Sequence, residues 1–242
     1  MPKFFAYKGQ IDKGSFVIEG EDAKHISTVL RLTEGDEIVI CDGEGTDYYC
    51  TLAESSKHRV VARIDRSCAN NSEPKVSITL YQGLPKSDKM ELIIQKCVEI
   101  GLVRIVPVKT EFAVAKLEGK EDKKRERWQK IAESAAKQCG RGIIPLVDRA
   151  MTFSEAVQDS KSCEGRIIPY ENEENYSIKS FARGFKGKSI AVFIGPEGGF
   201  SPKEIELAIS EGIKSVTLGR RILRTETAGL VAGAVLLYEL ED

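Results

Sequence analysis

The chain has 242 residues, of which 41% are apolar, and its 36 Lys and Arg residues nearly balance its 37 Asp and Glu residues. This size suits one large or two small domains with a sizeable core. There is no N-terminal apolar run typical of a signal peptide and no stretch of membrane-spanning length, so we expect a cytoplasmic protein rather than an exported or membrane-inserted one.

Cysteine and histidine usage argues against a metal site. The six cysteines form no C-x-x-C pair, and only His25 and His58 could assist as ligands. A catalytic cysteine would need a nearby base, and neither histidine lies in the C-terminal half of the chain. The sequence therefore predicts reduced, structural thiols and no metal.

The charge is unevenly distributed along the chain. The net charge is −3 for residues 1–68, +5 for 76–150 and −3 for 151–242. The basic middle segment includes "KEDKKRERWQK" (Lys120 to Lys130), a composition that is also typical of a solvated helix face with i,i+4 ion pairs. The charge pattern thus permits an RNA partner without requiring one.

The first 68 residues read mainly as short strands, which predicts a small β-barrel. The expected strands are Phe16 to Ile18, Glu37 to Cys41, Asp47 to Ala53 and Arg59 to Asp65. One helix is expected over Gly20 to Leu32, because Ala23, Ile26, Val29 and Leu30 share a helical face. The polar segment Cys68 to Lys75 is the best linker, so we predict a first domain over 1–70, a linker at 71–75 and a second domain over 76–242.

From Val76 onward, apolar strands alternate with helical patterns, which predicts an α/β domain with a mostly parallel sheet. The expected strands are Val76 to Gln82, Arg104 to Val108, Leu146 to Asp148, Arg166 to Pro169, Ser189 to Ile194 and Ser215 to Leu218. The expected helices are Lys86 to Ile100, Lys123 to Cys139, Phe153 to Ser160, Pro202 to Glu211 and Glu226 to Leu240.

Two loops follow strands in the C-terminal part, "GPEGGFS" and "LGRRILRTETAG". The first contains three glycines, so it exposes bare backbone at the carboxyl end of a strand, where open α/β sheets bind ligands. The second follows the next strand, and we expect adjacent strand ends to bring the two loops together. The glycine spacing fits neither a Rossmann fingerprint nor a Walker A loop, so NAD and nucleoside triphosphates are poor candidates.

The last helix is unusually rich in small residues. Ala228, Gly229, Ala232, Gly233 and Ala234 cluster in a stretch otherwise made of Leu and Val. A glycine inside a helix costs about 1 kcal/mol relative to alanine, so close packing has to compensate. We therefore expect another element to pack very close to this helix, within the chain or across a dimer.

The pairing of "FIGPEGGFSPKEIELA" with "SVTLGRRILRTETAGLVA" closely resembles the SPOUT class of RNA methyltransferases, and more narrowly the bacterial enzymes that methylate N3 of a uridine in 16S ribosomal RNA. The resemblance extends to "HISTVLRLTEGDEIVICDGEG", "LPKSDKMELIIQKCVEIGLVRIVPV" and "AAKQCGRGIIPLV". It implies a PUA-like RNA-binding barrel ahead of a trefoil-knotted domain, S-adenosylmethionine as cofactor, the small ribosomal subunit as partner, and a homodimer through the knot. Periodicity alone would not suggest a knot.

The resemblance also implies a set of site residues. The cofactor-binding residues are expected to be Pro169, Tyr170, Ile194, Gly195, Pro196, Glu197, Gly198, Leu218, Gly219, Ile222, Leu223, Arg224 and Thr227. Uracil N3 must lose an imide proton before it attacks the methyl group, so a base or an anion stabiliser is required, and Glu197 and Arg224 are the candidate catalytic residues. Candidate RNA contacts are His25, Arg31, Lys86, Lys89, Arg127 and Arg141, each of which is equally well explained as a structural or surface residue.

Two alternatives stay open. One is a SPOUT enzyme that methylates a ribose 2′-hydroxyl or another base. The other is a non-catalytic RNA-binding or ribosome assembly factor with the same fold, although such a binder would not need both C-terminal loops.

Overall fold

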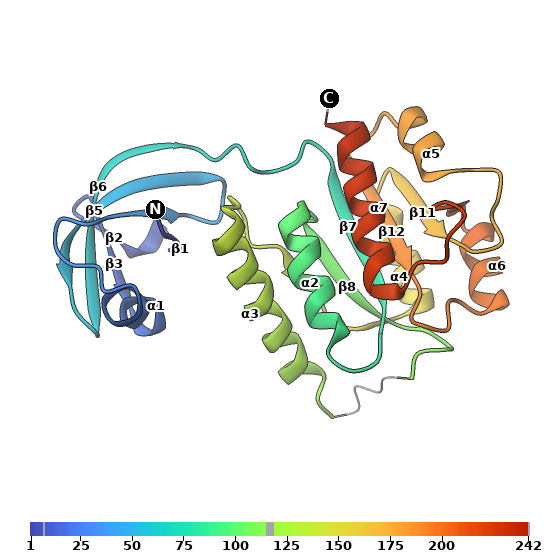
Figure 1. The fold of residues 1–242 in the computed structure, drawn as a ribbon, viewed down its shortest axis with the longest axis horizontal. Helices are drawn as coiled ribbons and strands as arrows, with labels where there is room; N and C mark the ends of the chain where they lie inside the picture. The colour runs from blue at the N-terminus through green and yellow to red at the C-terminus, as the bar shows by residue number, and fades with distance from the viewer. Residues whose placement is uncertain (7, 115–118, 242) are drawn as a thin grey trace. The chain divides into compact units, whose positions relative to one another are not determined.

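The computed structural model describes residues 1–6, 8–114 and 119–241. It divides into two compact units, and each is drawn in Figure 1. Unit 1 comprises Met1–Glu73 together with Ala136–Ile144, and unit 2 comprises Pro74–Ala135 together with Pro145–Asp242. The sequence-based boundaries place residues 136–144 in the second domain, whereas their contacts group them with the first. Among the described residues no helix is long and apolar enough to cross a membrane.

Unit 1 is built on a six-stranded sheet in the order β1-β4-β5-β6-β3-β2. Its strands are β1 (Lys3–Phe5), β2 (Ile11–Asp12), β3 (Ser15–Glu19), β4 (Glu37–Cys41), β5 (Thr46–Ser55) and β6 (Arg59–Ala69), with a short helix η1 (Lys8–Gln10) before β2. All four expected strands are confirmed, and β6 extends into the expected linker. The inward residues, which include Phe16, Ile38 and Leu52, alternate along the strands and form the core of the unit.

The helix expected over residues 20–32 is only partly formed. It begins as α1 (Gly20–Lys24), continues as the π-helix η2 (His25–Val29), and ends before Arg31, whose φ is +56°. Ala23 and Ile26 are buried as predicted, but the prediction was wrong for Val29, which is 63% exposed, and for Leu30. The reason is geometric: the i→i+5 bond from the Leu30 N–H to the His25 carbonyl adds a residue to the turn and rotates the later side chains off the buried face.

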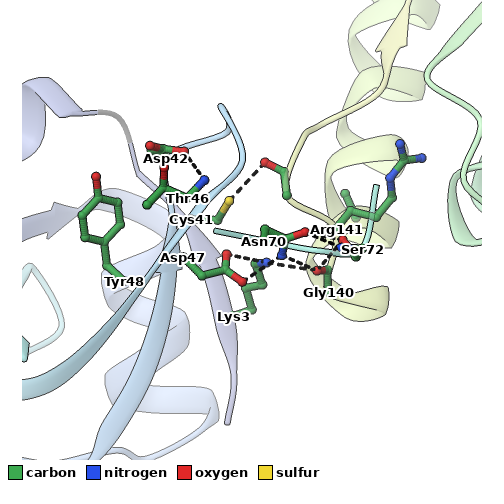
Figure 2. Close-up of polar contacts among 12 residues, drawn as sticks. Lys3, Cys41, Asp42, Thr46, Asp47, Tyr48, Asn70, Ser72, Gly140 and Arg141 are labelled. Carbon is green, nitrogen blue, oxygen red and sulfur yellow. Dashed lines mark hydrogen bonds and ion pairs between the residues drawn. The ribbon is translucent and has the colours of Figure 1, made fainter. Parts of the chain in front are cut away.

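Residues 136–144 join unit 1 through buried polar contacts, shown in Figure 2. The Lys3 ammonium lies 2.7 Å from a carboxylate oxygen of Asp47 and donates to the Gly140 carbonyl at 3.0 Å. The Asn70 amide donates to the same Gly140 carbonyl at 3.2 Å and to Asp47 at 2.8 Å. Residues far apart in the sequence are therefore held together by a connected hydrogen-bond network rather than by apolar packing alone.

Unit 2 is a parallel α/β structure. Its strands are β7 (Ser77–Gly83), β8 (Arg104–Lys109), β9 (Leu146–Val147), β10 (Met151–Thr152), β11 (Gly165–Pro169), β12 (Ser189–Ile194) and β13 (Lys214–Val216). Its helices are α2 (Lys89–Ile100), α3 (Glu121–Cys139, ending within unit 1), α4 (Phe153–Asp159), η3 (Ser160–Ser162), α5 (Ile178–Gly184), α6 (Pro202–Ser210) and α7 (Thr225–Leu240). The sequence did not predict β10 or α5, which are short and irregular in pattern.

The sheet runs β10-β8-β7-β12-β11-β13, with β9 also paired to β8, and every pairing is parallel. The predicted parallel sheet is thus confirmed. The expectation that the strands carrying the two C-terminal loops are neighbours was wrong, because β11 lies between β12 and β13. A crossover through α6 carries the chain past β11 to the sheet edge, which local sequence cannot specify.

Helix α6 begins as the sequence predicts. The Ser201 hydroxyl accepts the Glu204 N–H and the Glu204 carboxylate accepts the Ser201 N–H, which together form a capping box ahead of Pro202. This start fixes the end of the loop that follows β12.

Helix α7 lies against β7, β12, α2 and α5, as Figure 1 shows for this red helix. A Cβ at Gly233 would lie 2.7 Å from Leu102 Cδ1, and one at Gly229 would lie 3.3 Å from Leu80 Cδ2. The expected close packing of the small-residue helix is therefore confirmed, and it occurs within the chain.

Candidate functional site

A cavity of about 930 Å³ opens at the carboxyl ends of β11 and β12, beside the loop that follows β13. It is lined by Lys89, Pro169, Tyr170, Glu171, Glu173, Glu174, Ile194, Gly195, Pro196, Glu197, Gly198, Gly199, Phe200, Thr217, Leu218, Gly219, Arg220, Arg221, Ile222, Leu223, Arg224, Thr225 and Ala228. Twelve of the thirteen predicted cofactor-binding residues lie in this lining. The exception is Thr227, an exposed residue in the first turn of α7 whose N–H bonds to the Arg224 carbonyl.

The turn after β12 leaves no room for side chains. A Cβ at Gly195 would lie 2.9 Å from the Gly199 carbonyl carbon, and Gly199 itself has φ +70° and donates its N–H to the Pro196 carbonyl at 2.9 Å. At the end of β7, a Cβ on Gly83 would lie 2.6 Å from Pro196 Cδ. These glycines are required because bare backbone packs on bare backbone at the floor of the cavity.

Thr225 fixes this turn from behind. Its buried hydroxyl donates to the Gly195 carbonyl at 2.6 Å and accepts from the Gln82 amide at 2.8 Å. Gln82 is fully buried on β7, and the same amide also reaches the Gly83 carbonyl at 3.0 Å. The first residue of α7 thus connects the glycine turn to the central strand of the sheet.

The loop after β13 forms the opposite wall. The Thr217 hydroxyl accepts the Gly219 N–H at 3.1 Å, and Gly219 has φ +111°, so a tight turn directs the following residues across the cavity. Arg220, Arg221 and Arg224 are exposed on this wall, and Ile222 is 90% exposed. The wall therefore offers three guanidinium groups and an unburied aliphatic side chain to a ligand.

Lys89 lies between two carboxylates at the edge of the cavity. Its ammonium is 3.0 Å from Glu197 and 3.2 Å from Glu226, and the backbone N–H of Lys86 also donates to Glu197 at 3.2 Å. Hydrogen bonds to Glu197 and then to Glu226 raise the pKa of Lys89 above its usual value. This ion triad joins the start of α2, the glycine turn and the start of α7.

The two carboxylates of the triad are held ionised. Burial by itself would raise the pKa of Glu197, but hydrogen bonds from Lys89 and from backbone N–H groups keep that pKa below its usual value. The hydrogen bond from its own N–H lowers the pKa of Glu226 against the effect of burial, with Lys89 adding to the lowering. A paired carboxylate of this kind is a weak proton acceptor at neutral pH, which makes Glu197 a poor general base.

The candidate RNA contacts fall into different environments. Arg141 is only 2% exposed and its guanidinium pairs with Glu73, so it presents no open face to a phosphate. Lys89 is committed to the triad, whereas Arg127 is exposed on α3 within reach of Glu91 at 2.8 Å. The other three are exposed: Lys86 just before α2, His25 at the start of η2 and Arg31 just beyond it.

Sequence reasoning missed several residues of the site. Gln82 lies on a strand, where a polar residue carries no motif, and Thr225 lies within the "LGRRILRTETAG" stretch but was given no role of its own. The acidic stretch Glu171 to Glu174 lines the cavity from the loop between β11 and α5, and only its position after a strand could have indicated it. The role of Lys89 depends on two segments more than 100 residues away.

Cys41, Cys50 and Cys97 are buried free thiols, as expected of structural cysteines, whereas Cys68 is exposed. Burial raises the pKa of Cys97 to about 12, of Cys50 to about 12 and of Cys41 to about 11, so these side chains stay protonated at neutral pH. Within the described residues there is no group of three His, Cys, Asp or Glu side chains placed to hold a metal ion.

Comparison with known proteins covers nearly the whole chain. A family model described as an RNA methyltransferase domain matches residues 71–237, and one described as an RNA methyltransferase PUA domain matches residues 18–65. The chain is 36% identical over 241 residues to "Ribosomal RNA small subunit methyltransferase E" of Bacillus subtilis (strain 168), an alignment covering 97% of this chain and 94% of the relative.

Two solved structures resemble this one closely. A methyltransferase from Legionella pneumophila, in complex with the bound cofactor SAM, has a TM-score of 0.86 and 30% identity, with 97% of this chain and 96% of that chain covered. A ribosomal RNA small subunit methyltransferase E from Neisseria gonorrhoeae, bound to S-adenosyl methionine, has a TM-score of 0.86 and 31% identity, with coverages of 97% and 95%.

Proposed function

This chain belongs to the RNA methyltransferase family of the ribosomal RNA small subunit methyltransferases E, and on that premise we propose that it transfers a methyl group from S-adenosylmethionine to N3 of a uridine in 16S ribosomal RNA. The fold is the α/β SPOUT-class methyltransferase fold with an N-terminal PUA domain. The observation that carries the proposal is that the glycine turn, the arginine-rich loop and the end of β11 line one cavity. A ribosomal RNA substrate also agrees with a cytoplasmic location.

The residues of the cavity suit S-adenosylmethionine. Gly195 and Gly199 line the cavity with bare backbone, whose main-chain polar groups would be available to hold an adenosyl group. Gly195 has to be glycine because a Cβ there would lie 2.9 Å from the Gly199 carbonyl carbon and displace the turn. Carboxylates at Glu171, Glu173 and Glu174 favour a cationic ligand. The cofactor, when bound, supplies an electrophilic sulfonium methyl, so no metal is needed for the transfer.

Within this cavity the chain has two tasks: to position the acceptor nitrogen and to stabilise the anion left when the N3 proton departs. We assign the second task to Arg224, because its exposed side chain lines the cavity and a permanent cation favours the uracil imidate through an oxygen next to N3. Glu197 is better suited to hold the turn, because Lys89 and the Lys86 N–H occupy it. The proton then leaves to solvent rather than to Glu197.

A trefoil knot and a homodimer complete the proposal. The small-residue face of α7 packs tightly against β7 and Leu102, as a helix threaded through a loop requires. On the opposite side of α7, Ala234 and Tyr238 are exposed one helical turn apart, and Tyr238 is 79% exposed. This exposed aromatic face suits contact with a second copy of the chain.

The test is to incubate the full chain with tritiated S-adenosylmethionine and small ribosomal subunits that lack the modification, digest the RNA, and identify the labelled nucleoside. Label in N3-methyluridine supports the proposal. Label in a 2′-O-methyl nucleoside would favour the alternative SPOUT chemistry, and cofactor binding without label on subunits or naked 16S RNA would contradict the substrate.

The role of Arg224 has its own control. Removing a donor that stabilises developing negative charge costs about 10²-fold or more in kcat, so Arg224→Ala should lose at least that much. Arg183→Ala removes another exposed arginine, from α5 outside the cavity, and should leave kcat unchanged. A normal kcat in the Arg224→Ala variant would show that another residue stabilises the anion.

A further inference from the structure

We propose that Phe112, at the tip of the turn Thr110 to Ala113, is a stacking site for the pyrimidine base that accepts the methyl group. This inference deepens the proposed function and rests on its RNA substrate. The turn follows β8, so it lies at the same carboxyl edge of the sheet as the glycine turn.

The turn is held in place by a buried carboxylate. The Ala113 N–H donates to the Thr110 carbonyl at 3.1 Å, which closes the turn and leaves Phe112 inside it. The Glu111 N–H donates to Glu204 Oε1 at 2.9 Å, and Glu204 is only 9% exposed. Its other oxygen accepts the Ser201 N–H at 2.8 Å within the capping box of α6. One side chain therefore connects this turn to the end of the glycine loop.

Phe112 lies beside the cavity yet is not covered. Its side chain is 44% exposed, and a Cβ on Gly198 would lie 3.0 Å from the Phe112 Cβ. Gly198 lines the cavity, whereas Phe112 does not, so the ring lies on the outer side of the glycine turn. A large apolar side chain that is anchored but exposed at the rim of a cavity has surface available for a flat ligand.

The ligand that fits this position is the acceptor base rather than the cofactor. A nucleotide whose base is methylated has to leave its stack and present its edge to the methyl donor, and enzymes that act on bases stack the extruded ring on aromatic or apolar side chains. The cavity that Gly198 lines would hold the cofactor, so the base would approach from the rim. The exposed Arg220 and Arg221 on the facing wall suit the flanking phosphates.

The first experiment compares steady-state kinetics of the full chain and its variants on unmodified small subunits. Stacking of one base contributes about 5- to 150-fold in affinity, so Phe112→Ala should raise the KM for RNA within that range. The Kd for S-adenosylmethionine should stay at the wild-type value, because Phe112 is outside the cavity lining. Phe112→Trp should keep the KM for RNA near the wild-type value. Phe112→Leu keeps the bulk without the aromatic face, so its KM for RNA should rise almost as much as that of Phe112→Ala.

The matched control is Ile209→Ala, which removes an equally exposed apolar side chain from α6 outside the cavity and should leave both constants unchanged. Far-ultraviolet circular dichroism and the cofactor Kd identify any variant that fails to fold. A Phe112→Ala variant with the wild-type KM for RNA, or a Phe112→Leu variant equal to wild type, would overturn the stacking role.

A second readout does not depend on turnover. 16S RNA transcribed with 5-iodouridine in place of a fraction of its uridines is irradiated with the full chain in the presence of S-adenosylhomocysteine, and the cross-linked peptide is mapped. We expect the cross-link at Phe112. If the tritium assay labels another nucleoside, or shows no methylation at all, the N3 assignment is wrong. The cross-link would still test the stacking site, because it does not require turnover. Cross-links confined to other peptides would refute it.

Discussion

The Thr225 hydroxyl offers the sharpest test of how the cavity floor is held. Thr225→Val keeps the shape of the side chain but removes the donor to the Gly195 carbonyl and the acceptor for the Gln82 amide. Net contributions of neutral hydrogen bonds are about 1 kcal/mol each, so the two losses should lower the free energy of unfolding of unit 2 by about 2 kcal/mol. Because Gly195 lines the cavity, the Kd for S-adenosylmethionine should rise as well.

The assay can be confined to unit 2. Trp128 is the single tryptophan of the chain, it is buried, and it belongs to unit 2, so its fluorescence during urea unfolding reports that unit alone. Calorimetric titration gives the cofactor Kd. Thr225→Ser keeps the hydroxyl and should lose less than half as much stability. A Thr225→Val variant destabilised by less than about 0.5 kcal/mol, or a Thr225→Ser variant equally destabilised, would refute the reasoning.

Two further predictions concern the glycine turn and the ion triad. Gly83→Ala would place a Cβ 2.6 Å from Pro196 Cδ and should weaken cofactor binding at least about tenfold by moving the turn, since rigid backbone cannot yield. Gly184→Ala, where nothing lies within 4 Å, is the control and should bind normally; equal affinities in a titration would contradict the packing argument. Lys89→Met removes the cation of the triad. Because the pKa values of Glu197 and Glu226 are lowered in the folded state, these carboxylates stabilise the fold above the ordinary pKa of 4.5, and this stabilisation is lost as pH falls through their folded-state pKa values. The pKa of Lys89 is raised, so its stabilisation is present below the ordinary value of 10.5 and is lost as pH rises through its folded-state pKa. The stability difference from wild type should therefore be largest between those limits and shrink in acid, and a difference that is constant from neutral pH to about pH 3 would count against the triad.

Local pattern was enough to predict most elements of this chain. Strands such as Glu37–Cys41 and Ser189–Ile194 occur with the predicted bounds, because apolar runs bounded by turn residues leave few alternatives. The start of α6 follows from Ser201, Pro202 and Glu204 alone, since a capping box is made within four residues. The exceptions include β10 and α5, which the sequence did not predict, and Gly20 to Leu32, where helical spacing could not indicate the switch to a π-helix at His25.

Some parts of the candidate site could be found from the sequence and others could not. The glycine turn and the arginine-rich loop could be found in the sequence, because close backbone approach demands glycine and the two loops together resemble a known family. The partners that hold them could not be found. Glu204 reaches Glu111 and Lys89 reaches Glu197 across about 100 residues of chain, and the placement of β11 between β12 and β13 decides which strand ends share the cavity.

The sequence by itself therefore determined most of the element types, the parallel α/β class and the two loops that line the cavity, because these depend on interactions within a few residues. Only the tertiary structure decided that Glu197 is ion-paired with Lys89, that Arg141 is buried against Glu73, and that Phe112 is 44% exposed next to Gly198. The physical reason is that charge state and exposure are set by neighbours, and these neighbours come from distant segments that the sheet order brings together.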